Sequence, residues 1–260
     1  MERGNHHAMA VATRGVGSVH VLPHVSSSHA RVAPPLEGTE PQSHGGEGRI
    51  VQRTVEAELE RLWKEIEGCR SCPLADTSPR VVPGEGNPHS PMVIVGEGPG
   101  EREEEEGRPF VGRAGDLLNM LLASAGLRRE DLWITNVLKR RAVEPADSGV
   151  RNRPPTATEV AVYRRYLERE LQIISPRIVL CLGNVAANTL IHPNFRMTRE
   201  HGIWFTTPDG RMLMATFHPG YILRLRGSRR EEVLRLTAED FAAAAQQYRA
   251  LRGQIATGHP

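Results

Sequence analysis

A glycine-rich turn followed by a run of carboxylates carries the strongest chemical signal in this sequence. The stretch VGEGPGEREEEEGRPFVGRAG, residues 95–115, has glycines at positions 96, 98 and 100 and then five glutamates within residues 101–106. Glycines let a ligand come close to the backbone, whereas a dense run of carboxylates repels a phosphate group. The pattern therefore favours a flat or neutral ligand.

Other polar residues follow apolar runs that are rich in β-branched side chains. Thr135 and Asn136 come at the end of one run, Gly183 ends another, and His218 follows a third. In open α/β sheets, ligands bind outside the carboxyl ends of the strands. We therefore expect these residues to gather with the glycine-rich turn at one site.

The elements that must position these residues alternate along the chain. Strands are predicted over residues 92–97, 131–137, 177–183 and 211–219. Helical patterns lie between them, over residues 114–127, 156–175 and 184–191. Strands that alternate with helices predict a three-layer α/β/α fold with a central parallel sheet.

The chain divides into a tail and one domain. Residues 1–50 are rich in Gly, Ser, His and Pro without periodic apolar positions, which predicts a disordered tail. An amphipathic helix begins near Thr54 and opens the domain, residues 51–252, which a helical pattern over 230–253 closes. Residues 253–260 are predicted to be a C-terminal tail.

Composition indicates an ordinary soluble protein, with 39% hydrophobic and 25% charged residues. Nothing approaches the roughly 20 apolar residues of a membrane span, and no secretory signal is recognisable, so we expect a cytoplasmic protein without a membrane partner. The formal charge is only +2, but arginines cluster in residues 138–154 and 223–232. The arginine guanidinium can bind a phosphate group through two hydrogen bonds, so these clusters favour a nucleic-acid partner. Arginines on ordinary solvated surfaces remain the alternative.

Three cysteines are too few, and too unevenly placed, for a disulfide framework. Cys69 and Cys72 are spaced as C-x-x-C, and Cys181 lies inside an apolar run. Metal binding or a reduced state is the expectation.

Four motifs together resemble a known family. GEGPGEREEEEGRPFVGRAGDLL, ITNVLK, RNRPPTATE and FHPGYILR occur in the order and spacing of the type-4, thermophile-type uracil-DNA glycosylases, over about residues 59–250. The resemblance implies the uracil-DNA glycosylase fold and hydrolysis of the N-glycosidic bond of uracil in DNA, which leaves an abasic site and initiates base excision repair. A base inside a duplex is unreachable, so it must be flipped into a pocket.

The resemblance also implies how uracil is bound. Phe110 matches the aromatic residue that stacks on the ring, and Asn136 matches the amide that reads O4 and N3–H. Backbone N–H groups of the turn at Glu97 and Gly98 would hold the other edge. Taken alone, Phe110 would be an ordinary core residue and Asn136 a turn former.

Catalytic roles are implied for a histidine and a carboxylate. His218 matches the histidine that donates to uracil O2 and stabilises the leaving anion. Glu103 is the first candidate to position the water and stabilise the cationic sugar, and Glu97 is the second. Glutamates 104 to 106 are expected to be solvated and partly structural.

The segment HPGYILRLRGSRR resembles the family's minor-groove loop. Ile222 or Leu223 would be an apolar wedge that fills the space of the flipped base, and Arg224 would contact phosphate. Tyr221 and Arg113 are further candidates for DNA binding.

The resemblance fails at the cysteines. It implies a 4Fe-4S cluster on four cysteines, but only Cys69 and Cys72 are present, and Arg140 and Tyr163 stand at the other two places. Neither replaces a thiolate. Cys181 lies where the family has no ligand. We therefore predict that the cluster is absent or severely weakened and that the chemistry needs no cofactor.

Alternatives to a monomeric enzyme with ordinary turnover remain. Asn152 stands where a relative that becomes covalently attached to DNA has a histidine, which argues against that relative. A catalytically drifted DNA-binding protein of the same fold is a second alternative. A nucleotide or methyl-donor enzyme that uses the glycine-rich turn is a third, disfavoured by Pro99 and the acidic run.

Overall fold

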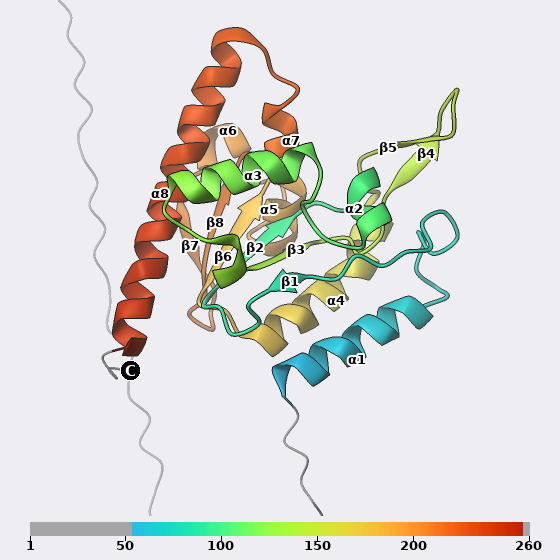
Figure 1. Ribbon diagram of the computed structural model, residues 1–260, viewed down its shortest axis with the longest axis horizontal. Helices are drawn as coiled ribbons and strands as arrows, with labels where there is room; N and C mark the ends of the chain where they lie inside the picture. Colours follow the sequence, from blue (N-terminus) through green and yellow to red (C-terminus); the bar gives the residue numbers. More distant parts are fainter. Residues whose placement is uncertain (1–53, 257–260) are drawn as a thin grey trace, which may run out of the picture. The chain divides into compact units, whose positions relative to one another are not determined.

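The computed structural model describes residues 54–256, with side chains as far as residue 253, and these residues form a layered α/β structure (Figure 1). A six-stranded sheet has the order β1-β3-β2-β6-β8-β7. Its four central strands are parallel: β3 (Trp133–Asn136), β2 (Met92–Gly96), β6 (Ile178–Leu182) and β8 (Met212–Thr216). These are the four strands that the apolar runs predict, so the parallel sheet is confirmed.

Two short antiparallel strands, which the sequence did not predict, form the edges of the sheet. They are β1 (Glu85–Gly86), paired with β3, and β7 (Trp204–Thr206), paired with β8. A separate hairpin of β4 (Val143–Pro145) and β5 (Val150–Asn152) forms where only a loop was expected.

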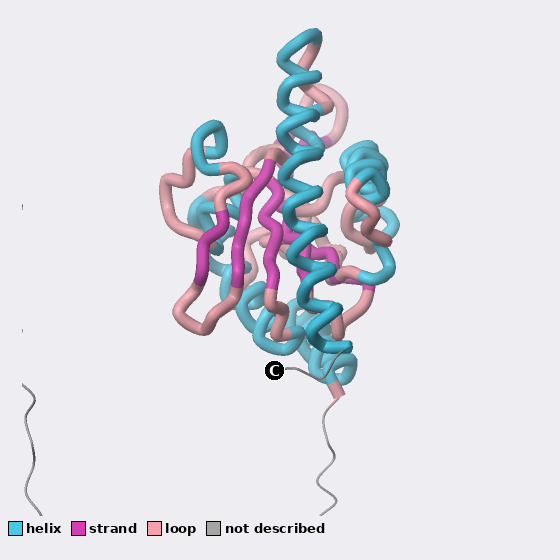
Figure 2. Tube along the Cα trace, turned by 90° about the vertical axis from the view of Figure 1, so that its left-hand side faces the viewer, coloured by secondary structure: helices cyan, strands magenta, loops and turns pink. Residues whose placement is uncertain are grey.

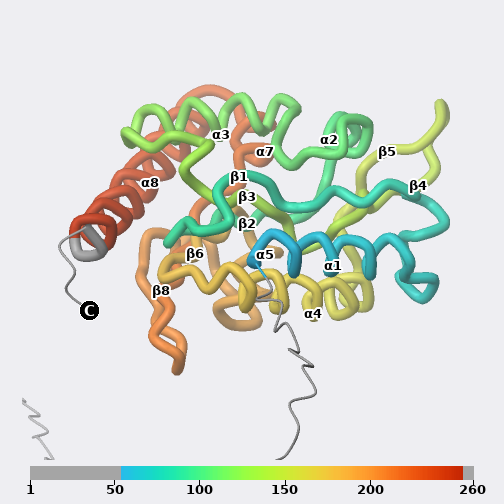
Figure 3. Tube along the Cα trace, turned by 60° about the horizontal axis from the view of Figure 1, so that its bottom comes forward, coloured from blue at the N-terminus to red at the C-terminus, as the bar shows by residue number. Residues whose placement is uncertain are grey.

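Helices cover both faces of the sheet, as the three-layer prediction requires. On one face lie α3 (Arg113–Ser124) and the long α8 (Gly227–Ala256), which Figure 2 shows in front of the strands. On the other lie α1 (Val55–Gly68), α4 (Ala157–Ile174) and α5 (Asn184–Leu190) (Figure 3). Every residue of β2 and β6 is buried between these layers, as expected for strands covered on both faces.

The remaining helical segments are short: α2 (Glu101–Glu106), η1 (Arg129–Asp131), α6 (Met197–Glu200) and α7 (Pro219–Ile222). The sequence predicted no helix over the acidic run because it lacks an apolar period, and α2 corrects this. Its carboxylates favour a helix N-terminus, Gly100 N–H donates to Glu103 Oε2 at 3.1 Å, and Gly107 ends the helix with a φ of 73°.

The predicted boundaries of the domain, residues 51 and 252, stay a prediction, and a described helix lies near each of them. Thr54 caps α1, where its side chain accepts from the Ala57 N–H at 3.2 Å, so the predicted start of the helix is confirmed. At the other end α8 continues to Ala256, beyond the predicted boundary at residue 252. The predicted tail over residues 1–50 lies outside the described residues. None of the helices within residues 54–256 is long and apolar enough to cross a membrane.

Candidate active site

A pocket of about 910 Å³ opens at the carboxyl ends of the parallel strands. The sequence predicted the site at this edge of the sheet. The predicted residues that line it are Glu97, Gly98, Glu103, Phe110, Arg113, Asn136, Asn152, Gly183, His218, Tyr221 and Arg224. The pocket thus brings together residues that are up to about 130 positions apart in the chain, as expected where strand ends meet.

Phe110 and Asn136 meet over a glycine at the end of β2. A Cβ atom at Gly96 would clash with Cζ of Phe110 and with Oδ1 of Asn136, so only glycine fits there. Phe110 has a φ of 53°, a left-handed conformation that non-glycine residues rarely adopt. Arg129 holds this turn, because its guanidinium donates to the carbonyl oxygens of Pro109 at 2.6 Å and Phe110 at 3.2 Å. Local strain of this kind clusters at functional sites.

The side-chain amide of Asn136 has an unused acceptor. The residue is only 3% exposed, and its Oδ1 accepts no hydrogen bond from any described residue. A buried acceptor without a partner costs free energy. Because the residue lines the pocket, a bound ligand with an N–H group would satisfy it.

His218 lies at the start of α7 as a neutral hydrogen-bond donor. Its Nδ1 accepts from the Gly220 N–H at 3.0 Å, so in the neutral ring the hydrogen is on Nε2. Burial, together with the charge of Arg224, lowers the pKa of His218 to about 4. Its ring centroid lies 5.8 Å from that of Phe110. Gly183 permits this packing, because a Cβ there would lie 2.9 Å from Cβ of His218.

The two candidate carboxylates differ in their contacts. Glu103 is buried, and it accepts from the N–H of Gly100 at 3.1 Å and of Gly112 at 3.4 Å. It therefore holds two turns of the pocket wall together. Glu97 is half-buried, and no side chain or N–H within residues 54–256 donates to its carboxylate. Burial raises the pKa of Glu97, against the opposing charge of Arg224.

Comparison with known proteins assigns the family. The sequence profile of the uracil DNA glycosylase superfamily matches residues 83–242. This chain belongs to the uracil-DNA glycosylase superfamily. The predicted three-layer α/β/α fold and the family membership that the motifs indicated are thereby confirmed.

Within the superfamily, several similar proteins are named type-4 uracil-DNA glycosylase. The one from Thermotoga maritima is 38% identical over 192 residues, which cover 74% of this chain and 95% of the relative. The one from Archaeoglobus fulgidus is 46% identical over 134 residues, 52% of this chain and 64% of the relative. The one from Pyrobaculum aerophilum is 38% identical over 180 residues, 65% of this chain and 88% of the relative. The chain thus belongs to the type-4 family.

The minor-groove loop predicted from the family is α7 with the residues after it. Arg224 and Arg113 are exposed at the pocket, and Tyr221 lines it while stacking on Phe217 at 6.1 Å. Ile222 is fully buried in the hydrophobic core, which favours Leu223 over Ile222 as the wedge. Leu223 is half-buried and stays a prediction.

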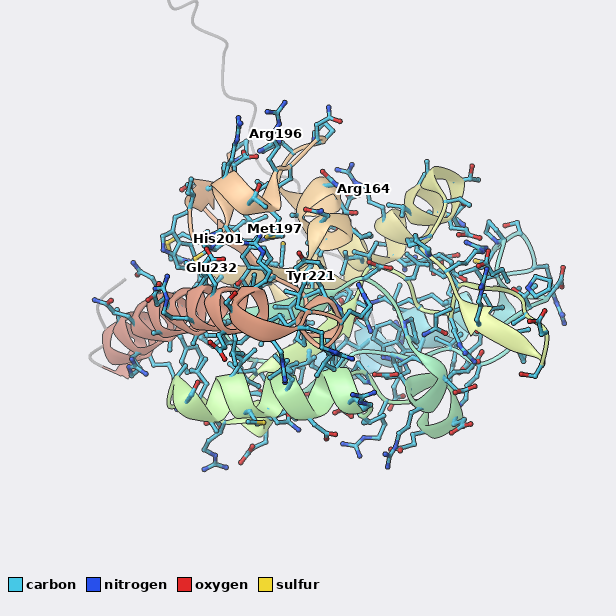
Figure 4. All side chains as sticks on the ribbon, turned by 90° about the horizontal axis from the view of Figure 1, so that it is seen from above. Arg164, Arg196, Met197, His201, Tyr221 and Glu232 are labelled. Carbon is cyan, nitrogen blue, oxygen red and sulfur yellow. The ribbon has the colours of Figure 1, made fainter. Side chains whose placement is uncertain are left out.

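Two residues near the site were missed by the sequence analysis. Met197, from α6, lines the pocket together with Tyr221, from α7, and both are labelled in Figure 4. No pattern marks Met197, because α6 is only one turn long. Lys139 is fully buried and donates to the main-chain oxygen of Asn136, and its signal was a lysine two positions after the predicted strand over residues 131–137.

The cluster that the family resemblance implies does not fit the residues present. Within residues 54–256, no group of three or more His, Cys, Asp or Glu side chains could hold a metal ion. Cys69 and Cys72 are free thiols, and Arg140 and Tyr163 lie buried beside them. A guanidinium has no lone pair to offer iron, so two thiolates alone are left where four are needed.

Proposed function

We propose that this protein is a uracil-DNA glycosylase that hydrolyses the N-glycosidic bond of uracil in DNA and leaves an abasic site. The observation that carries this proposal is the convergence of three groups in one pocket: the ring of Phe110, the unsatisfied amide oxygen of Asn136 and the neutral donor of His218. Similar proteins named type-4 uracil-DNA glycosylase support it.

The amide of Asn136 would select uracil by its polarity. Oδ1 would accept from N3–H and Nδ2 would donate to O4, while the base stacks on Phe110. Cytosine has an acceptor at N3 and an amino group at C4, so it would leave both amide groups unpaired in a buried place. Unpaired buried groups give strong discrimination.

His218 would stabilise the departing base. Breaking the glycosidic bond puts negative charge on uracil and cation-like charge on the sugar. The hydrogen on Nε2 can donate to uracil O2 as the charge develops, like a donor in an oxyanion hole. Because the ring is neutral at physiological pH, this bond needs no proton transfer.

Glu97 would act on the sugar side. The sequence placed Glu103 ahead of Glu97, but the contacts favour the reverse order, because two backbone N–H groups already engage Glu103. Glu97 lines the pocket, and its carboxylate has no donor among the described residues, so it is available to a water molecule there. It would position that water and stabilise the cationic sugar. Glu103 would then hold the pocket wall.

DNA would lie across the rim of the pocket. Arg113 and Arg224 would contact phosphates, and Leu223 would enter the space of the flipped base. Since one chain supplies every proposed role, we infer that the active form is a monomer that needs no cofactor for the chemistry.

Excision from a single-uracil oligonucleotide tests the proposal. Wild type is incubated with oligonucleotides that carry uracil, thymine or cytosine at one position, and hot alkali then cuts abasic sites. Cutting of the uracil strand alone, weakened by Asn136→Ala and by His218→Ala, is expected. No cutting, with DNA binding retained, would mean a drifted DNA-binding protein. A DNA–protein adduct on a denaturing gel would mean a covalent relative, against the expectation from Asn152.

A further inference from the structure

The CxxC segment, residues 69–72, follows the end of α1, and α1 packs against α4 (Figure 1). Cys69 follows α1 directly and is half-buried, whereas Cys72 is buried. From α4, Tyr163 is fully buried beside Cys72. The ring of Tyr166 lies 6.4 Å from that of Tyr163. Two aromatic side chains thus fill the space beside the two thiols.

Arg140 connects the segments on both sides of the CxxC segment. It is 3% exposed, and its Nη1 donates to the carbonyl oxygens of Ser78, at 2.9 Å, and of Pro79. Its Nη2 donates to the carbonyl oxygens of Ile66 and Glu67, each at 3.4 Å. One guanidinium therefore joins the end of α1 to the segment that follows the CxxC motif.

The charge of Arg140 also suits this place. The last carbonyl groups of a helix lack the usual intrahelical partner and carry the negative end of the helix dipole. In α1 the Ile66 carbonyl accepts from the Cys69 N–H at 3.2 Å as well as from Arg140. Ile66 and Glu67 belong to the last turn of α1, which has no basic residue of its own. Arg140 supplies the missing cation from a distant part of the chain.

We propose that Arg140 and Tyr163 replace the iron–sulfur cluster as structural elements, so that a contact network made only of protein joins α1, the CxxC segment and α4. Arg140 connects the segments that the cluster would join, and the Tyr163 side chain fills the space that the cluster would occupy. This network leaves two buried polar groups without a hydrogen bond: Arg140 Nε and the Tyr163 hydroxyl have no partner among the described residues. This inference concerns folding and does not depend on the proposed enzymatic activity.

Reconstitution with iron and sulfide tests the exchange. Wild type and an Arg140→Cys/Tyr163→Cys double variant, which restores four cysteines, are incubated anaerobically with ferrous iron and sulfide. Wild type is expected to stay colourless, and the double variant to gain a brown chromophore with iron at cluster stoichiometry. A cluster in wild type would overturn the proposal. Failure of a folded double variant to bind iron and sulfide would contradict the placement of Arg140 and Tyr163 at the missing ligand positions.

Stability of the iron-free protein tests the connecting role. Arg140→Met keeps the length of the side chain but loses the donors, and it is expected to lower the urea midpoint of unfolding clearly. Arg140→Lys keeps the charge but cannot reach both pairs of carbonyl groups, so its urea midpoint should lie between those of wild type and Arg140→Met. If the Met variant does not fold, the Lys variant still tests the connecting role. Cys69→Ser, at the half-buried cysteine of the pair, is the matched control and should change the midpoint little. An Arg140→Met variant as stable as wild type would refute the connecting role.

Discussion

Lys139 and Glu170 form a fully buried ion pair behind the pocket, with Lys139 Nζ 2.5 Å from Glu170 Oε2. The same ammonium donates to the main-chain oxygen of Asn136 at 2.7 Å and to Thr135 Oγ1 at 2.6 Å. Trp133 Nε1 donates to the other carboxylate oxygen at 2.7 Å. The pair therefore fixes the end of β3, which carries the amide proposed to recognise uracil.

Removing one member of this pair should damage both stability and binding. Lys139→Met leaves the Glu170 carboxylate buried and unpaired, which typically costs about 3–5 kcal/mol. Urea unfolding measures this loss. The Lys139→Met/Glu170→Leu double variant removes both charges and should recover much of the stability. If the pair positions Asn136, the double variant will still have a raised KM for uracil DNA, whereas an unchanged KM would show a purely structural role.

Stability should depend on pH through His218. Its pKa is about 4 in the folded protein, against 6.5 for the ordinary group, so the unfolded chain takes up a proton first as the pH falls. The free energy of unfolding should therefore decrease as the pH falls from about 6.5 to about 4. His218→Gln keeps a polar side chain without this titration. Urea unfolding of both proteins at neutral and at mildly acidic pH should show a smaller decrease for the variant. Equal decreases would rule out His218 as the cause.

Substitutions of Glu97 and Glu103 should have different effects, one on the rate of excision and the other on stability. Glu97→Gln should lower the single-turnover rate by about 10²- to 10⁴-fold, the usual contribution of a positioned base, with little change in stability. Glu103→Gln should instead lower stability by about 0.5–2 kcal/mol, because it weakens a helix cap. Since burial raises the pKa of Glu97, the acid limb of the rate profile should lie above pH 4.5. A larger rate loss in Glu103→Gln would restore the order that the sequence suggested.

The sequence predicted the parts of the fold that depend on continuous burial. The four central strands are buried almost throughout because helices cover both faces, and their apolar residues reveal them in the sequence. Their polar end residues converge because parallel strands end at the same edge of the sheet. Strands β1 and β7 have only two and three residues, too few for a pattern. Helix α2 forms through capping and charge without an apolar face. The Lys139–Glu170 pair joins positions 31 residues apart, which only the tertiary structure brings together.

The different burial of Ile222 and Leu223 also could not be predicted from the sequence, and it leads to a further prediction. They are apolar neighbours in the sequence, yet Ile222 lies in the core with no exposure while Leu223 is half-buried. Ile222→Ala should therefore cost about 2–5 kcal/mol of stability by opening a cavity. Leu223→Ala, at a half-buried residue that packs against the core, should lower the urea midpoint less than Ile222→Ala and should slow excision of uracil from duplex DNA. The effect on single-stranded DNA should be smaller, because no stacked partner base has to be replaced there. Equal slowing on both substrates would mean that Leu223 shapes the pocket and does not act as a wedge.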